Sequence, residues 1–298
     1  MSSLRWRWAV ACMGALLLGA LAWAQQTPPQ AGAVDLTPYL QAEVNEVAIL
    51  NAQVAFLQQQ GDPLNAAVIA SYIPDHQAQA VRLSAVLQAN CGTAPAIQPN
   101  ITPQMGTLPS MLAQDLQAHQ TAIANYRQLS QSTNDANIHM LADLGSGAAI
   151  NHFNSLTLAQ AAVLKTPQAL NNAVLAALAL EQTAVNDLQA QATQLTALND
   201  VNGASLLQTS VQAHQQQVNR LTLIANQLCL PTNQLNLPTP VSFAARPDIL
   251  QHTRSFNTLL INTYAVEISA LPNGPLQQAI VGAQQVALLN LSQLQQLA

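Results

Sequence analysis

The chain contains an internal repeat, and this repeat restricts the possible folds more than any other feature of the sequence. The segment Asp75–Leu83 matches the segment Ala213–Leu221, and both contain a histidine followed by a Gln-x-x-Arg-Leu run. His76 aligns on His214 at an offset of 214 − 76 = 138 residues. Helical periodicity alone would not place histidine, arginine and leucine in the same register twice.

Other blocks match in the same order along the chain. Glu46 aligns on Glu181 at an offset of 135, the pair Asp115 and His119 aligns on Asp248 and His252 at 133, and Cys91 aligns on Cys229 at 138. Because the offset changes only across expected loops, we interpret the chain as a tandem duplication. One copy occupies residues 36–164 and the other occupies residues 167–298.

Each copy is predicted to be helical. From Leu36 onward, apolar residues recur three and four positions apart, as in helices packed in a bundle. Threonine or aspartate precedes a proline at several expected helix starts, where the proline nitrogen needs no hydrogen bond. The breaks between periodic segments give eight helices, at 36–60, 63–90, 109–131, 136–164, 167–197, 202–229, 247–271 and 275–297. We therefore expect an all-α fold of two tandem up-down four-helix bundles.

The N-terminus has the pattern of a signal peptide. Arg5 and Arg7 form a basic region, an apolar stretch runs from residue 9 to 21, and Ala22-Trp23-Ala24 provides small residues around a cleavage site. We expect residues 1–24 to be removed and 25–35 to be a linker; the alternative is an uncleaved anchor. No later stretch has the roughly eighteen apolar residues of a membrane helix. The mature chain is thus expected to be exported, either periplasmic or secreted, without a transmembrane segment.

The charge of the chain argues against nucleic acid as a partner. Of eight basic residues, Arg5 and Arg7 leave with the signal peptide, and the remaining six face thirteen acidic residues. The resulting net charge of about −7 offers no clustered cations for phosphates. Charged residues make up only 7% of the chain, so glutamine, asparagine, serine and threonine form most of its polar surface. Such a surface suits an envelope protein partner or a homo-oligomer.

Several polar side chains fall on the apolar stripes of the first copy. His76, His119 and His152 lie on the second, third and fourth predicted helices, and Glu43 and Glu46 lie one turn apart on the first. Three imidazoles and a carboxylate from four helices are therefore expected to point into one core. Burying a carboxylate is unfavourable unless a cation or several donors lie beside it. Imidazole and carboxylate together are typical ligands of iron, zinc or copper.

The second copy offers fewer of these groups. Glu181, His214 and His252 recur, but the position that matches His152 is Asn290, a poorer metal ligand. Two interpretations remain open at this stage: a transition-metal site, at least in the first half, or a polar core layer without metal. Asp115 and Asp248, one turn before their histidines, are expected to orient those rings.

These features resemble the ferritin-like superfamily, and most of all the exported bacterial ferritin-like domains that are distant relatives of rubrerythrin. The resemblance implies tandem four-helix bundles with a metal site in the bundle core. It carries over to the following residues as metal-site candidates: Glu46, His76, Asp115, His119, His152, Glu181, His214, Asp248 and His252. Well-studied di-iron members carry Glu-x-x-His on two helices, whereas here Ile73 and Ala149 stand three residues before the histidines.

Two functions are compatible with these residues. The first is an exported ferritin-like protein that binds a transition metal. The second is a non-catalytic structural or interaction module of the cell envelope with a degenerate site. The sequence assigns no reaction or substrate. After signal cleavage only Cys91 and Cys229 remain, and their matching positions leave a disulfide between them open.

Overall fold

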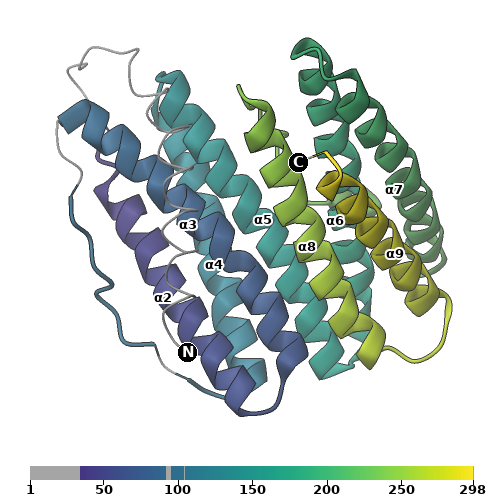
Figure 1. The fold of residues 1–298 in the computed structure, drawn as a ribbon. Coiled ribbons are helices and arrows are strands. Elements are labelled where there is room, and N and C mark those ends of the chain that lie inside the picture. The colour runs from purple at the N-terminus through teal and green to yellow at the C-terminus, as the bar shows by residue number, and fades with distance from the viewer. Residues whose placement is uncertain (1–33, 92–94, 104, 298) are drawn as a thin grey trace, which may run out of the picture.

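The computed structural model describes residues 34–297 apart from 92–94 and 104, and its described residues contain eight α-helices, one short 3-10 helix and no strand (Figure 1). The helices are α2 (Thr37–Gln59), α3 (Pro63–Cys91), α4 (Leu108–Ser132), α5 (Ala136–Leu164), α6 (Pro167–Ala197), α7 (Val201–Gln227), α8 (Arg246–Ala270) and α9 (Pro275–Gln295), with η1 at Thr232–Gln234. The all-α prediction is confirmed. The proposed signal peptide at 1–24 and most of the linker at 25–35 lie outside the described residues.

The predicted helix boundaries agree with the structure within two residues, because local signals set them. Thr166 accepts a hydrogen bond from the Ala169 N–H (3.2 Å) at the start of α6. Asp200 accepts one from the Gly203 N–H (2.8 Å) at the start of α7. Such N-caps satisfy backbone donors that have no partner inside the helix. The turn after α2 uses Gly61, whose φ of 75° favours glycine.

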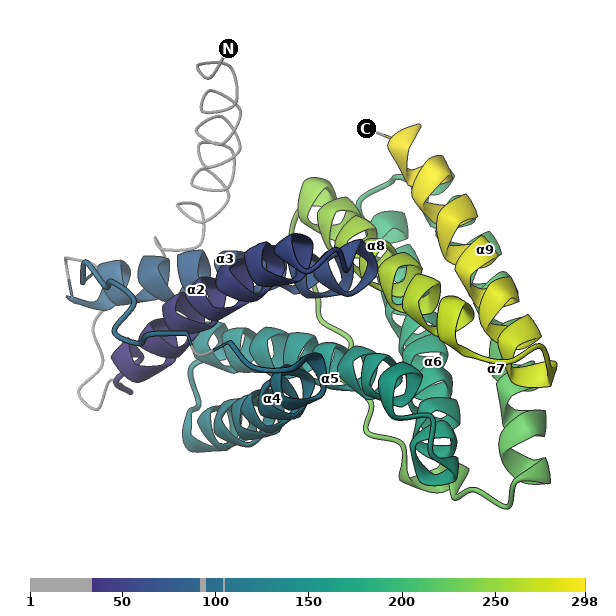
Figure 2. The ribbon, with the colours of Figure 1, turned by 90° about the horizontal axis from the view of Figure 1, so that it is seen from below.

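The helices pack in consecutive pairs: α2 with α3, α4 with α5, α6 with α7, and α8 with α9. The two halves then meet where α3 and α5 of the first half pack against α8 and α6 of the second. Figure 2 shows the first-half helices on one side of the molecule and the second-half helices on the other. Of the first-half helices, α3 and α5 thus lie nearest the junction.

A polar layer crosses the first half between two apolar clusters. On one side Leu40, Leu83 and Leu129 pack together with other residues of α2 to α5. On the other side lies a larger cluster that includes Leu50 and Leu112. The side chains between these clusters are polar and buried, so each needs a partner or a ligand.

The larger apolar cluster is shared by both halves. It contains Tyr72 and Leu156 from the first half together with Ala177, Leu259 and Ile280 from the second. The division into two bundles near residues 165–166 stays a prediction, since this core continues across the junction.

Two further sequence expectations concern the chain as a whole. Within the described residues, no helix combines the length and the apolar character needed to cross a membrane. Cys229, just after α7, is an exposed free thiol, so it does not form the bridge to Cys91 that their matching positions allowed.

Candidate metal centre

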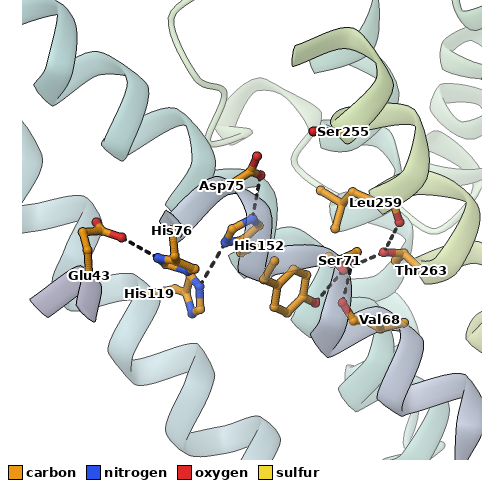
Figure 3. Close-up of polar contacts among 12 residues, drawn as sticks. Glu43, Val68, Ser71, Asp75, His76, His119, His152, Ser255, Leu259 and Thr263 are labelled. Carbon is orange, nitrogen blue, oxygen red and sulfur yellow. Dashed lines mark hydrogen bonds and ion pairs between the residues drawn. The ribbon is translucent and has the colours of Figure 1, made fainter. Parts of the chain in front are cut away.

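Three histidines from three helices meet in the polar layer of the first half. His76 comes from α3, His119 from α4 and His152 from α5, and all three are buried. One ring nitrogen of each lies within 4.8 Å of the others, which is the only such group of possible ligands in the described part of the chain (Figure 3). The predicted convergence of these three histidines is confirmed.

Each of these rings uses one nitrogen in a hydrogen bond to an oxygen. His76 Nδ1 lies 2.6 Å from Glu43 Oε2, His119 Nδ1 lies 2.8 Å from the main-chain oxygen of Asp115, and His152 Nε2 lies 3.1 Å from Asp75 Oδ2. An oxygen acceptor holds the proton on the nitrogen that faces it. The second nitrogen of each neutral ring then carries a lone pair. Histidine ligands of metals have the same arrangement, with the other N–H donated to an acceptor.

The inner nitrogens, of which His119 Nε2 and His152 Nδ1 are within hydrogen-bond distance of each other, are spaced as ligands of one ion would be. His119 Nε2 and His152 Nδ1 are 3.2 Å apart. Two nitrogens bound to a tetrahedral zinc ion at about 2.0–2.1 Å would lie roughly 3.3–3.4 Å apart. His76 Nε2 is buried and has no hydrogen-bond partner. An unpartnered buried nitrogen beside two others is an arrangement that a metal ion would complete.

Glu43 is held from both sides. Its Oε2 accepts from His76, and its Oε1 accepts a short hydrogen bond from the Tyr126 hydroxyl. Tyr126 reaches this position across Gly145 of α5, where an added Cβ would lie 2.5 Å from the tyrosine Cζ. The glycine therefore makes room for the ring that fixes the carboxylate.

The charges on the three rings are unequal. Burial lowers the pKa of His76, but Glu43, Glu46 and Asp75 outweigh it and raise that pKa to about 9. Burial and the two other histidines lower the pKa of His119 well below its ordinary value. Burial also lowers the pKa of His152, against the opposite effect of the hydrogen bond that this ring donates to Asp75. Two rings are thus neutral at pH 7, and the proton on His76 is one that a bound metal would displace.

Two further carboxyl groups border this cluster. Burial raises the pKa of Glu46, and its Oε1 has no hydrogen-bond partner. Asp115 accepts from Gln53 Nε2 through Oδ1 (2.8 Å), its Oδ2 is unpartnered, and burial raises its pKa to about 7. Glu46 and Asp115 thus border the three rings without belonging to the compact ligand group. Asp115 orients His119 through its main-chain oxygen, where the sequence led us to expect its carboxylate.

An aromatic ring covers one side of the cluster. Tyr72 stacks on His152 with ring centroids 4.4 Å apart. Its hydroxyl bonds to Ser155 Oγ (2.7 Å), which bonds to Thr263 Oγ1 (2.6 Å) in the second half (Figure 3). Side chains of both halves therefore fix the wall of the first-half cluster.

The second half contains a related network that is closed. His214 Nδ1 lies 2.8 Å from Glu181 Oε2, and Tyr264 donates to Glu181 Oε1 (2.6 Å). Asn290 Nδ2 donates to His214 Nε2 (2.8 Å), and Ser210 donates to Asn290 Oδ1 (2.8 Å). His214 thus has partners on both nitrogens, and no lone pair is left for a metal.

These contacts correct the register of the repeat. Glu181 takes the place of Glu43, not of Glu46, because each accepts from a histidine 33 residues later and from a tyrosine 83 residues later. The offset is therefore 138, as for His76 and His214. The same offset pairs helix ends, since α3 and α7 begin at Pro63 and Val201, α4 and α8 at Leu108 and Arg246.

His252 and Asp248 are not brought to the second-half network. His252 Nε2 lies 3.3 Å from Asp187 Oδ2, and its ring packs near Phe243. Burial lowers the pKa of Arg82, and the charges of Asp75 and then of Asp248 act against this effect, so Asp248 lies nearer to Arg82 than to His214 in its interactions. At a constant offset of 138, Asp115 and His119 correspond instead to Thr253 and Asn257. The match at an offset of 133 is therefore wrong as a structural equivalence.

Sequence reasoning missed the residues that hold the rings. Tyr126 and Tyr264 recur at the offset of 138, and so do Glu43 and Glu181, so a fixed offset would have found them. Asp75 stands beside His76 in the sequence, where no pattern indicates its role. Only the packing of α3 on α5 shows that its carboxylate serves His152.

Comparison with models of protein families, with curated proteins and with solved structures gives no match for this chain.

Proposed function

We propose that this is an exported ferritin-like helical-bundle protein that binds one divalent transition-metal ion through His76, His119 and His152. The observation that carries the proposal is the orientation of the three rings. Each outer N–H already has an oxygen acceptor, and the three inner nitrogens face one another within 4.8 Å. His76 Nε2 is also buried without a hydrogen-bond partner, and a bound ion would give it one.

The ligand type favours zinc, copper or iron. Imidazole nitrogen suits these borderline ions, whereas calcium and magnesium prefer several oxygen ligands. Three protein nitrogens leave one coordination position open, where a zinc or copper ion would hold water or a small ligand. Glu46, whose charge interacts with His76 and whose buried Oε1 has no partner, is a candidate to receive a hydrogen bond from that ligand.

The tandem organisation and export are part of the same proposal. The offset of 138 that recurs in the hydrogen bonds, and in the starts of α3 and α7 and of α4 and α8, supports a duplicated four-helix unit. The basic, apolar and small-residue segments of residues 1–24 support cleavage and export. N-terminal sequencing of the chain recovered from the periplasm or medium tests this part. A mature chain that still begins at Met1 would contradict it.

Metal content tests the site. The chain purified without chelator should carry about one ion per molecule by elemental analysis. His119→Ala should lose most of it, because the cluster then keeps two ligands. His139→Ala is the matched control, since His139 is exposed and lies outside the cluster. Equal metal in all three proteins would refute the proposal.

Fluorescence offers a second readout at the site itself. All three tryptophans lie within residues 1–24, so the four tyrosines dominate the emission of the mature chain. Tyr72 stacks directly on His152, so bound Cu²⁺ should quench its emission. Tyr72→Phe should reduce the quenching while metal content persists, and the remainder should come from Tyr126, which reaches His76 through Glu43. Quenching that is unchanged in this variant would place the copper elsewhere.

The alternative function, a structural module without metal, draws on the second half. Its network is buried and complete with hydrogen bonds alone, so a polar layer of this kind can exist without an ion. Chelator treatment separates the two functions. A metal protein should lose thermal stability with chelator, because an ion bound only to the folded state stabilises it by mass action. A structural module should melt at the same temperature.

A further inference from the structure

We infer that the second half holds a closed copy of the metal site, in which Asn257 and Asn290 stand where the first half has His119 and His152. The inference rests on the proposed function of the first half. It identifies a latent site for the same divalent transition ion around His214. It also explains why one half is open and the other closed.

The equivalence rests on hydrogen bonds that recur in both halves. Asn257 Nδ2 donates to the main-chain oxygen of Thr253 (2.8 Å), as His119 Nδ1 does to that of Asp115 (2.8 Å). Gln191 bonds to the Thr253 hydroxyl, as Gln53 bonds to the Asp115 carboxylate. Backbone and neighbours are therefore conserved between the halves at the two positions where the ligand type changes.

The Asn290 amide closes the copy. Its Nδ2 donates a hydrogen bond to His214 Nε2 (2.8 Å), the atom equivalent to the unpartnered Nε2 of His76. Ser210 fixes the other end of the amide (2.8 Å). The amide thus supplies the contact that an ion would make in the first half.

Asn257 does not replace the ligand atom of His119. Its side chain is too short to present a nitrogen where His119 Nε2 lies, and its Oδ1 is buried without a partner. Ser210 also replaces Tyr72, so the second half lacks the ring that stacks on His152.

Two of the three oxygen acceptors are already present. Glu181 holds His214, and the Thr253 carbonyl faces position 257. The third acceptor is missing, because Ala213 stands where Asp75 accepts from His152. The substitutions that should open the site are therefore Ala213→Asp, Asn257→His and Asn290→His together.

The experiment is a Co²⁺ titration of the full chain, followed by absorption in the visible range and by elemental analysis. The triple variant should bind about two ions where the natural chain binds about one. Adding His214→Ala to the triple variant should return it to about one. A folded triple variant that binds no more cobalt than the natural chain would overturn the inference. A natural chain without metal and a triple variant that gains one would instead refute only the first-half proposal.

The reciprocal exchange keeps the inference testable if the triple variant does not fold. His119→Asn with His152→Asn makes the first half resemble the second. This double variant should lose its cobalt spectrum and keep its melting temperature better than the double alanine variant, since an amide can form a hydrogen bond with His76 Nε2. Retained cobalt binding, or stability no better than that of the alanine variant, would overturn the inference.

Discussion

Replacing Glu267 with leucine should stabilise the protein by an amount that increases with pH. Glu267 lies on α8, is fully buried, and has no hydrogen-bond partner on either oxygen. Its counterpart 138 residues earlier is Leu129, which is buried in an apolar cluster of the first half. Burial raises the pKa of Glu267 from 4.5 to about 8. Leucine at 267 would give the second half the residue that its counterpart already has.

The sign follows from where the proton is lost. The unfolded chain loses it near pH 4.5, whereas the folded chain keeps it up to about pH 8. Between these values unfolding releases a proton, so the free energy of unfolding falls as pH rises, by about 1.4 kcal/mol per pH unit. Over the whole interval the loss is on the order of 5 kcal/mol. Below pH 4.5 the carboxyl group is neutral in both states, and burying it without a hydrogen-bond partner lowers the free energy of unfolding by about 1–3 kcal/mol.

Urea unfolding of both proteins from pH 4 to pH 9, with chelator present, measures the effect. Subtracting the two curves removes every other titrating group, because the chains differ only at Glu267. The stability difference should rise steadily from about pH 4.5 and level off near pH 8. A difference that stays constant over this range would refute a buried, protonated Glu267. Glu267→Gln, which cannot ionise, should share the pH profile of the leucine variant.

Two other substitutions test the two networks. His76→Ala should remove most of the bound metal, which elemental analysis measures. His214→Ala should keep the metal and lower the free energy of unfolding by about 1–3 kcal/mol in urea, because it removes the hydrogen-bond partner of the buried Glu181 carboxyl and of the Asn290 amide. Gly145→Ala should displace Tyr126 and weaken metal binding several-fold, as a Cβ there would overlap the ring. Gly147→Ala is its control, since the nearest atom to that Cβ lies at 3.4 Å, and equal affinity in both glycine variants would contradict the role of Gly145.

Helix positions were predictable because their causes are local. Prolines in first turns, capping threonines and aspartates, and apolar spacing act within a few residues. The three clustered histidines were predictable for a similar reason, since each lies on the apolar stripe of its own helix. Helices that pack by these stripes necessarily bring His76, His119 and His152 into one core.

The partners of the rings were not predictable with the same certainty, because they depend on contacts between helices. Glu43 and Glu46 lie one turn apart, and the stripe alone does not decide which reaches His76. The match at an offset of 133 arose because the spacing Asp-x-x-x-His, which puts both side chains on one face of a helix, occurs both at Asp115 and at Asp248. Structure separates the two, because hydrogen bonds identify the equivalent backbone positions.

The hydrogen bond from Ser155 to Thr263 changes what a substitution in the second half means. Through Ser155, the Thr263 hydroxyl of α8 fixes Tyr72, which lies against His152. The two halves thus depend on each other, as the two different subunits of a heterodimer do. The first half holds the three histidines, and the second half supports them. Residues of the second half that pack against the first half are then constrained by this packing, even though they are not candidate metal ligands. A chain cut between the halves would lose this support together with the shared apolar core.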